Sequence, residues 1–156
     1  MIPEPIFQTD SYDVLRPIFS KEQIRKHNAQ RYEMEMLDGV LHYDKEKRVI
    51  VGYYEMTPDR WWAKGHFPDR PMMPGVLALE SAGQLCSIYF NEYSQGLRMG
   101  LAKIGEVRYV RPMEPPDTLF ILGRLVNKKL KFANFEFQGI INHQVVFYGE
   151  FTGGAI

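Results

Sequence analysis

The residues of this chain that could do chemistry lie in one short stretch near its middle. His66, Gly75 and Glu80 fall within fifteen residues of one another. Histidine titrates near neutral pH and can act as a general base, and a carboxyl group on an apolar helix suits a general acid. A glycine N–H at a helix start can stabilise an oxyanion. Together they indicate removal of a proton beside a polarised carbonyl with acid assistance to a leaving group, which is a β-elimination.

Each of these residues also has a purely structural interpretation. A single loop histidine is more often a hydrogen-bonded structural residue than a catalyst. Glu80 lies one helical turn before Gln84, so a hydrogen bond between the two side chains explains it equally well. Gly75 could serve only the turn into the helix. The elimination hypothesis therefore depends on all three residues occurring together, with Gln84 able to orient Glu80 in either case.

The surrounding sequence predicts one long central helix. A loop that contains Pro68, Pro71 and Pro74 is followed by residues 75–90, which are apolar or small at nearly every position. Proline is tolerated at a helix start, where the first N–H groups have no intrahelical acceptor. A helix that is apolar on all sides is typical of a protein interior, and this one is too short and too polar in its middle to span a bilayer.

Runs rich in β-branched and aromatic residues predict strands on both sides of that helix. Before it we expect strands over residues 32–36 and 48–56, with turns at Asp38-Gly39 and Asp44-Lys45. After it we expect strands over residues 101–111, 118–127, 131–141 and 144–152. Short connections favour an antiparallel meander. The sequence thus predicts an α+β fold in which a curved antiparallel sheet wraps around a long central helix.

Composition is that of a single globular domain. The chain has 156 residues, of which 45% are hydrophobic and 24% charged. Lys and Arg number 19, as do Asp and Glu, so no positive field favours a nucleic-acid partner. A lone cysteine, Cys86, cannot form an internal disulfide, and the first residues lack a secretory pattern. We expect a cytoplasmic protein with neither a nucleic-acid nor a membrane partner.

Residues 65–84 read Gly-His-Phe-Pro-Asp-Arg-Pro-Met-Met-Pro-Gly-Val-Leu-Ala-Leu-Glu-Ser-Ala-Gly-Gln. This segment closely resembles the active-site segment of the bacterial 3-hydroxyacyl-[acyl carrier protein] dehydratases, the FabZ and FabA group. The resemblance continues more weakly from about residue 31 to the C-terminus, which divides the chain into an N-terminal arm (1–30) and one dehydratase domain (31–156). It implies a hot-dog fold and a homodimer, or a trimer of such dimers, with active sites across the dimer interface.

The resemblance also assigns roles to individual residues. It implies that His66 is the catalytic histidine and that Glu80 is the catalytic acid, supplied by the other subunit. The Gly75 N–H would hold the thioester carbonyl, and Gln84 would support the acid. The implied reaction is dehydration of 3-hydroxyacyl thioesters on acyl carrier protein to trans-2-enoyl thioesters, in fatty acid synthesis or a related lipid or polyketide pathway. No metal or cofactor is expected, because the thioester already acidifies C2.

The acyl chain and its carrier would need surfaces of their own. Beside the helix, the candidates for the lining of an acyl tunnel, which could equally be plain core, are Met72, Met73 and Leu77. Residues 98–131 hold eight basic against three acidic residues, and a basic face would steer an acidic carrier protein. The candidates for that face, which could also simply face solvent, are Arg108, Arg111, Lys128 and Lys129.

Two sets of residues resemble different branches of the family. Glu80 and the Phe-Pro that follows His66 resemble the FabZ type, which only dehydrates. Residues 58–62 (Pro-Asp-Arg-Trp-Trp) and 104–108 (Ile-Gly-Glu-Val-Arg) resemble the FabA type, which carries aspartate as the acid and also isomerises the double bond. We favour the FabZ type because the acid is itself the catalytic group. The alternatives are a FabA-type dehydratase/isomerase, a hot-dog acyl thioesterase and a non-catalytic acyl-binding subunit.

Overall fold

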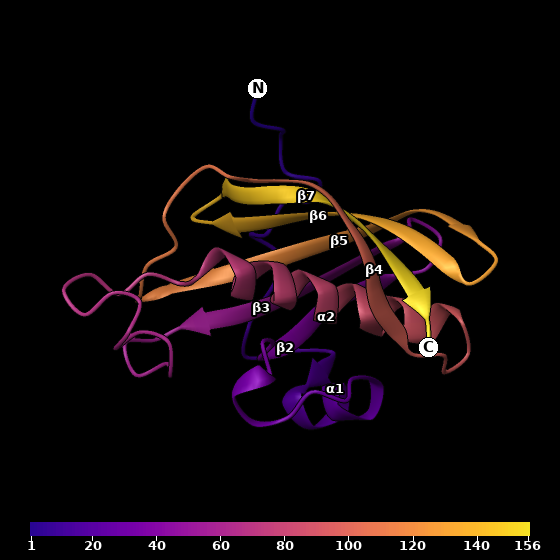
Figure 1. Cartoon of the computed structure of the whole chain (residues 1–156), viewed down its shortest axis with the longest axis horizontal. Coiled ribbons are helices and arrows are strands. Elements are labelled where there is room, and N and C mark those ends of the chain that lie inside the picture. The colour runs from indigo at the N-terminus through magenta and orange to yellow at the C-terminus, as the bar shows by residue number, and fades with distance from the viewer.

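A single antiparallel sheet curves around one long helix in the computed structural model, which describes all 156 residues (Figure 1). The helices are α1 (Lys21–His27), the short 3-10 helix η1 (Tyr32–Met34) and α2 (Gly75–Tyr93). Across the sheet the strands follow the order β1 (Phe19–Ser20), β2 (Gly39–Asp44), β3 (Val49–Met56), β5 (Asp117–Lys129), β6 (Phe132–Ile141), β7 (Gln144–Ala155) and β4 (Met99–Tyr109). The predicted α+β architecture is confirmed.

The main core lies between α2 and the concave face of the sheet. Leu85, Cys86 and Tyr89 on α2 are completely buried there. A glycine in β3 permits this close approach, since a Cβ atom at Gly52 would lie 2.7 Å from Cδ1 of Leu85. Burial of a large apolar side chain contributes about 1.5–3 kcal/mol, so this interface fixes the position of α2 on the sheet.

One side of α2 is left uncovered, which differs from the expectation of a helix buried on all sides. Val76 is 72% exposed, and no atom lies within 4 Å of the place that a Cβ at Gly83 would occupy. Leu79 and Glu80, which share this side of the helix, are half-buried. The sheet therefore encloses α2 only partly, and the acidic residue lies on its open side.

Residues 32–36 do not form the strand that their alternation predicted. Tyr32 begins η1 and has a φ of 59°. The neighbouring backbone groups bond to a side chain on α2 rather than to a strand. Gln84 Nε2 donates to the Met34 carbonyl at 2.7 Å, and Gln84 Oε1 accepts from the Met36 N–H at 3.0 Å. Tyr32 and Met34 are exposed and only Met36 is buried, so the alternation of apolar residues marks no buried face.

Two of the connections also differ from those expected. The strand β2 begins at Gly39, within the pair predicted to form a turn, and pairs with β3 from its first residue. The turn after Asp44 is confirmed. The hairpin between β5 and β6 turns at residues 130–131, with a φ of 54° at Leu130. Lys128 and Lys129 therefore belong to the end of β5 and not to a loop.

The first 18 residues cross the outer face of the sheet, on the side away from α2. The buried side chain of Gln138 fastens them in place, since it accepts from the Ile6 N–H at 2.7 Å and donates to the Glu4 carbonyl at 3.0 Å. The Tyr53 hydroxyl donates to the Val14 carbonyl at 3.0 Å. In Figure 1 the N-terminus emerges beyond β7, on the opposite side of the molecule from α1. The arm thus shields a second, smaller apolar cluster on the sheet.

The helix α1 begins directly after Ser20. The Ser20 side chain accepts a hydrogen bond from the Gln23 N–H, and the Gln23 side chain accepts one from the Ser20 N–H. The two residues therefore form a capping box at the start of α1. Ile24 on this helix is buried in the main core. Residues 19–30 are therefore part of the domain, and the segment that lies apart on the outer face ends near residue 18. Neither α-helix combines the length and apolar character that crossing a membrane requires.

Candidate active site

His66 lies in the loop between β3 and α2, held by hydrogen bonds from both its backbone and its ring. Its N–H donates to the Trp62 carbonyl at 2.9 Å, and its own carbonyl accepts from the Met72 N–H at 2.7 Å. The ring Nδ1 lies 2.7 Å from the Met72 carbonyl oxygen. A carbonyl can only accept, so Nδ1 carries the proton and the neutral ring has Nε2 free to take one. The Phe67 ring stacks on the imidazole at 4.1 Å between centroids.

An open cavity of about 400 Å³ adjoins this histidine. Its lining comes from the loop, from the start of α2 and from the end of β4, and consists of His66, Met72, Met73, Gly75, Tyr109, Val110, Arg111, Pro112 and Met113. Two of the expected tunnel residues, Met72 and Met73, line it, whereas Leu77 does not. A larger hollow of about 580 Å³ lies under the N-terminal arm on the outer face of the sheet and contains none of the predicted catalytic residues.

The start of α2, where Gly75 lines the cavity, has two free N–H groups. The Pro74 carbonyl accepts from the Leu77 and Ala78 N–H groups, while the N–H groups of Gly75 and Val76 have no acceptor within the chain. These free donors lie at the positive end of the helix dipole. The predicted oxyanion donor, Gly75, therefore lies in the same cavity as His66.

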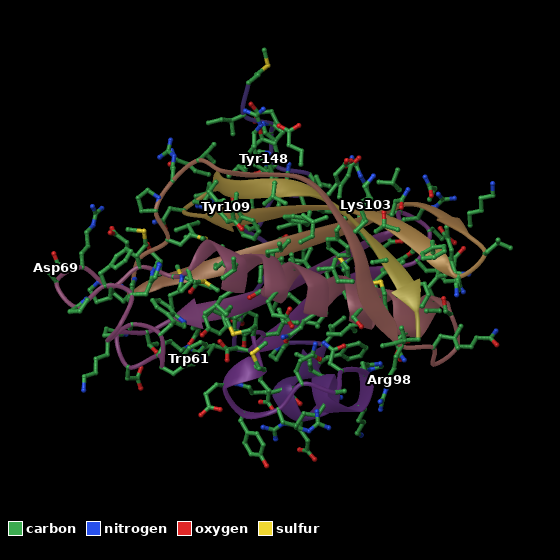
Figure 2. The ribbon with its side chains drawn as sticks, in the orientation of Figure 1. Trp61, Asp69, Arg98, Lys103, Tyr109 and Tyr148 are labelled. Carbon is green, nitrogen blue, oxygen red and sulfur yellow. The ribbon has the colours of Figure 1, made fainter.

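Tyr109 on β4 is a cavity residue that no sequence signal marked. Its hydroxyl donates to the Gly75 carbonyl at 2.6 Å, and burial raises the pKa of the phenol, which keeps it protonated as a donor. The ring stacks on Phe147 at 5.9 Å. A run of aromatic and β-branched residues predicted the strand but could not indicate that this side chain meets the helix start. Figure 2 shows Tyr109 at the end of the molecule where the loop with Trp61 and Asp69 lies.

Glu80 is half-buried on α2 and accepts two hydrogen bonds on the same oxygen. Gln84 Nε2 donates to Oε1 at 2.8 Å, as the sequence suggested, and Gln30 Nε2 donates to it at 3.3 Å. Gln30 lies in the segment expected to be outside the domain, and no sequence signal marked it. Gln84 is buried and is further held by the backbone of residues 34–36.

Within one chain, Glu80 and His66 do not lie in the same cavity. Glu80 is absent from the lining of the cavity that contains His66 and Gly75. Five residues of helix separate Gly75 from Glu80, which places them about 140° apart around the helix axis. The structure therefore brings two of the three predicted catalytic residues together and turns the third toward the open side of α2.

The four basic residues expected to face a carrier protein divide into two pairs. Arg111 lines the cavity, whereas Arg108, three residues before it at the same end of β4, pairs with Glu106 and lines the hollow under the N-terminal arm. The pairing of β5 with β6, β6 with β7 and β7 with β4 aligns Lys129 with Gly100 of β4. Arg108 lies eight residues further along β4, which corresponds to about 26 Å along the strand. Lys128 and Lys129 consequently lie at the opposite end of the sheet from the cavity.

Other reactive side chains fit structural roles. Cys86 is fully buried against the sheet, and burial raises the pKa of its thiol well above the ordinary range, so it stays a neutral core residue. No three His, Cys, Asp or Glu side chains are grouped as a metal-binding cluster.

Comparison with known proteins agrees with this fold. Residues 28–150 match the FabA-like domain family. The dehydratase of Xenorhabdus doucetiae described as the heterocomplex ApeI:P superposes with a TM-score of 0.64 at 16% identity, over 85% of this chain and 90% of that one. The PaaI protein of Escherichia coli, from the phenylacetic acid degradation operon, gives a TM-score of 0.59 at 17% identity, over 75% and 78% of the two chains. These likenesses show that the fold is the hot-dog fold.

Two curated relatives define the family more narrowly. The 3-hydroxyacyl-[acyl-carrier-protein] dehydratase FabZ of Fusobacterium nucleatum is 30% identical over 130 residues, which cover 83% of this chain and 92% of that protein. The FabZ of Francisella tularensis subsp. novicida is 34% identical over 136 residues, covering 79% and 83%. The chain belongs to the FabZ-type family of 3-hydroxyacyl-[acyl-carrier-protein] dehydratases, within the FabA-like group.

Proposed function

We propose that this protein dehydrates 3-hydroxyacyl thioesters on an acyl carrier protein to trans-2-enoyl thioesters, in fatty acid synthesis or a related lipid or polyketide pathway. The family supports the reaction class, and the names of the relatives supply the carrier. The observation that carries the proposal is the orientation of His66. Its Nδ1 is committed to the Met72 carbonyl, so Nε2 is available as a base in a cavity that also contains the free Gly75 N–H.

In the proposed mechanism, His66 Nε2 removes a proton from C2 of the substrate. The electron pair of that C–H bond forms the C2–C3 double bond, and the charge that moves onto the thioester oxygen is stabilised by the Gly75 N–H. The C3–O bond breaks as Glu80 donates its proton to the hydroxyl, which leaves as water. Transfer of the proton from His66 back to Glu80 through solvent resets the site. The reaction needs no metal or organic cofactor, because the thioester itself acidifies C2.

The acid in this mechanism comes from a second subunit. Glu80 lies outside its own chain's cavity and on the open side of α2, next to the exposed Val76. The strand β4 is the last in the sheet, so one of its edges has no partner strand, and its side chains Leu101 and Ile104 are 55% and 48% exposed. A homodimer that covers these surfaces would bring Glu80 of one subunit to the cavity of the other. Three such dimers could then form a hexamer.

The decisive assay follows the ultraviolet absorbance of a conjugated enoyl thioester as the purified protein acts on crotonyl and longer enoyl or 3-hydroxyacyl thioesters. Dehydration or hydration without isomerisation would support the FabZ-type reaction. A shift of the double bond in the product would indicate the FabA type, and release of free thiol would indicate a thioesterase. Absence of all three would overturn the proposal.

A variant pair then tests the base. His66→Ala should lower the rate to the background of the assay without changing the circular dichroism spectrum. His143→Ala is the matched control, because that histidine is exposed in the β6–β7 turn and pairs with Asp10 of the arm. Full activity of His66→Ala would refute the assignment.

Subunit mixing tests whether the site is shared. Neither His66→Ala nor Glu80→Ala should be active alone. When the two chains are expressed together, half of the dimers are mixed, and each mixed dimer regains one intact site, giving about a quarter of wild-type activity. A site built within one chain would give no recovery.

A further inference from the structure

We propose that Gln30 is a second positioning residue for the catalytic acid, an inference that rests on the proposed function of Glu80. Gln30 Nε2 donates to Glu80 Oε1 at 3.3 Å, and Gln84 Nε2 donates to the same oxygen at 2.8 Å. Glu80 Oε2 has no hydrogen-bond partner within the chain. The two amides therefore fix one carboxyl oxygen and leave the other to exchange the proton with substrate.

Gln84 alone does not settle where Glu80 points. Both hydrogens of its amide nitrogen are in use, one on the Met34 carbonyl and one on Glu80, while its oxygen accepts from the Met36 N–H. Gln84 is thus rigid, but a carboxylate held by one donor can still rotate about that bond. A second donor from another direction removes this freedom, since two hydrogen bonds from separate elements define an orientation.

The backbone around Gln30 is itself fixed to α2. The Arg31 guanidinium donates to the Gln30 carbonyl at 2.7 Å and to the Asn28 carbonyl at 2.9 Å. The buried Asn28 amide in turn donates to the backbone carbonyl of Gln84 at 3.0 Å. The loop that presents Gln30 is therefore attached to the helix one turn beyond the acid.

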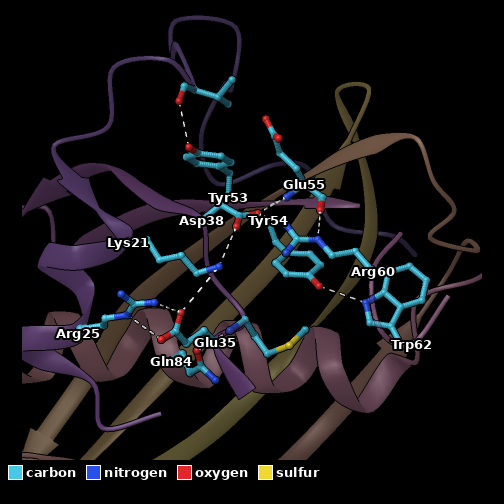
Figure 3. Close-up of polar contacts among 12 residues, drawn as sticks. Lys21, Arg25, Glu35, Asp38, Tyr53, Tyr54, Glu55, Arg60, Trp62 and Gln84 are labelled. Carbon is cyan, nitrogen blue, oxygen red and sulfur yellow. Dashed lines mark hydrogen bonds and ion pairs between the residues drawn. The ribbon is translucent and has the colours of Figure 1, made fainter. Parts of the chain in front are cut away.

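The segment that follows the loop is attached to α1 by charge. Figure 3 shows Lys21 and Arg25 converging on Glu35, close to Gln84 on α2. Arg25 makes two hydrogen bonds to the Glu35 carboxylate, at 2.7 and 3.0 Å. The chain on both sides of Gln30 is thus fixed, which makes its amide a preorganised donor rather than a mobile surface group.

This placement predicts which kinetic constant depends on Gln30. Gln30 acts on Glu80 Oε1 and not on the oxygen that exchanges its proton with substrate, so its loss should leave KM nearly unchanged. Misorientation of the acid slows the chemical step, because proton transfer needs the carboxyl within hydrogen-bonding reach of the leaving hydroxyl. The effect should therefore appear in kcat.

The experiment compares three variants of the full chain in the enoyl thioester assay. Gln30→Leu, which keeps the size and removes the donor, should lower kcat about tenfold, as expected for one hydrogen bond to a carboxyl group that becomes charged as it gives up its proton, with KM within twofold. Gln30→His retains an N–H donor of similar reach and should recover most of that loss. Gln23→Leu is the matched control in the same segment. It removes the side chain that bonds the Ser20 N–H, and should lower the melting temperature without lowering kcat.

The outcomes separate this inference from the proposed function. An active wild-type protein whose Gln30→Leu variant keeps its kcat would overturn the positioning role and leave the dehydratase assignment intact. Equal losses in Gln30→Leu and Gln30→His would overturn it as well, since the donor would then not matter. A wild-type protein with no dehydratase or hydratase activity would instead refute the proposed function itself.

Discussion

The Tyr109 hydroxyl donates a 2.6 Å hydrogen bond to the Gly75 carbonyl, and the Tyr109 ring occupies the place that a side chain at position 75 would take. A Cβ there would lie 2.8 Å from two ring atoms. This contact joins β4 to the start of α2 at the cavity. A glycine at position 75 is therefore required by the close approach of the ring.

The first prediction is that Gly75→Ala lowers kcat/KM by about tenfold or more. The added methyl group must displace either the Tyr109 ring or the helix start. A displaced oxyanion donor lowers the rate by at least about tenfold. Steady-state kinetics with an enoyl thioester measure it. Glu92→Ala, an exposed position near the C-terminal end of the same helix, should leave kcat/KM unchanged. Equal kinetics for both variants would contradict the prediction.

The second prediction concerns the carrier protein. Arg111 lines the cavity, whereas Lys128 and Lys129 lie at the far end of the sheet. Arg111→Glu should lower kcat/KM for carrier-bound substrate about tenfold at low salt, because it reverses a charge where an acidic carrier would dock. The paired change Lys128→Glu and Lys129→Glu should have much less effect.

Salt provides the control for this second prediction. Activity on carrier-bound substrate should fall as ionic strength rises, whereas activity on a small thioester should not, because screening acts on the protein–protein encounter. A stronger effect of the two lysines than of Arg111 would place the carrier at the other end of the molecule.

The third prediction concerns the N-terminal arm. Deletion of residues 1–18 uncovers the apolar outer cluster, which includes Leu41, Leu122 and Ile140. The free energy of unfolding should fall by about 2–5 kcal/mol, the value expected for losing the burial of several half-covered side chains. Urea denaturation measures the loss, and light scattering should show self-association through the exposed face. A truncated protein as stable and as monodisperse as the full chain would show that the arm has no structural role.

The fourth prediction concerns pH. Hydrogen bonding from Arg25 lowers the pKa of Glu35, so this pair stabilises the fold above the unfolded-state pKa of glutamate, about 4.3. The stabilisation disappears as pH falls through the lower, folded-state pKa. Arg25→Gln should therefore lower the melting temperature at pH 7 by roughly 2 °C or less, because Arg25 is largely exposed. The difference should shrink as the pH falls below the ordinary titration range of glutamate, and a difference that persisted once Glu35 is protonated would show that packing, not charge, is lost.

Local sequence determined most of the elements and the family. Proline at position 74 followed by an apolar run predicted α2, and runs of β-branched and aromatic residues predicted the strands after it, because these signals act between near neighbours. The types and spacing of His66, Gly75 and Glu80 indicated the chemistry before any geometry was known. The hydrogen bond from Gln84 to Glu80 was also foreseeable, since residues four apart on a helix are neighbours.

Contacts between distant segments decided the rest. Residues 32–36 alternate like a strand, yet their backbone groups bond to Gln84, about fifty residues away in sequence. No local pattern could place Gln30 beside Glu80 or Tyr109 beside Gly75, because such pairs depend on how the sheet closes around the helix. Helix periodicity by itself sets Glu80 about 140° from Gly75 around α2, and the closure of the sheet decided which of those two sides meets the His66 cavity. The sequence by itself determined which groups could carry out the reaction, and the tertiary structure decided which of them meet within one chain.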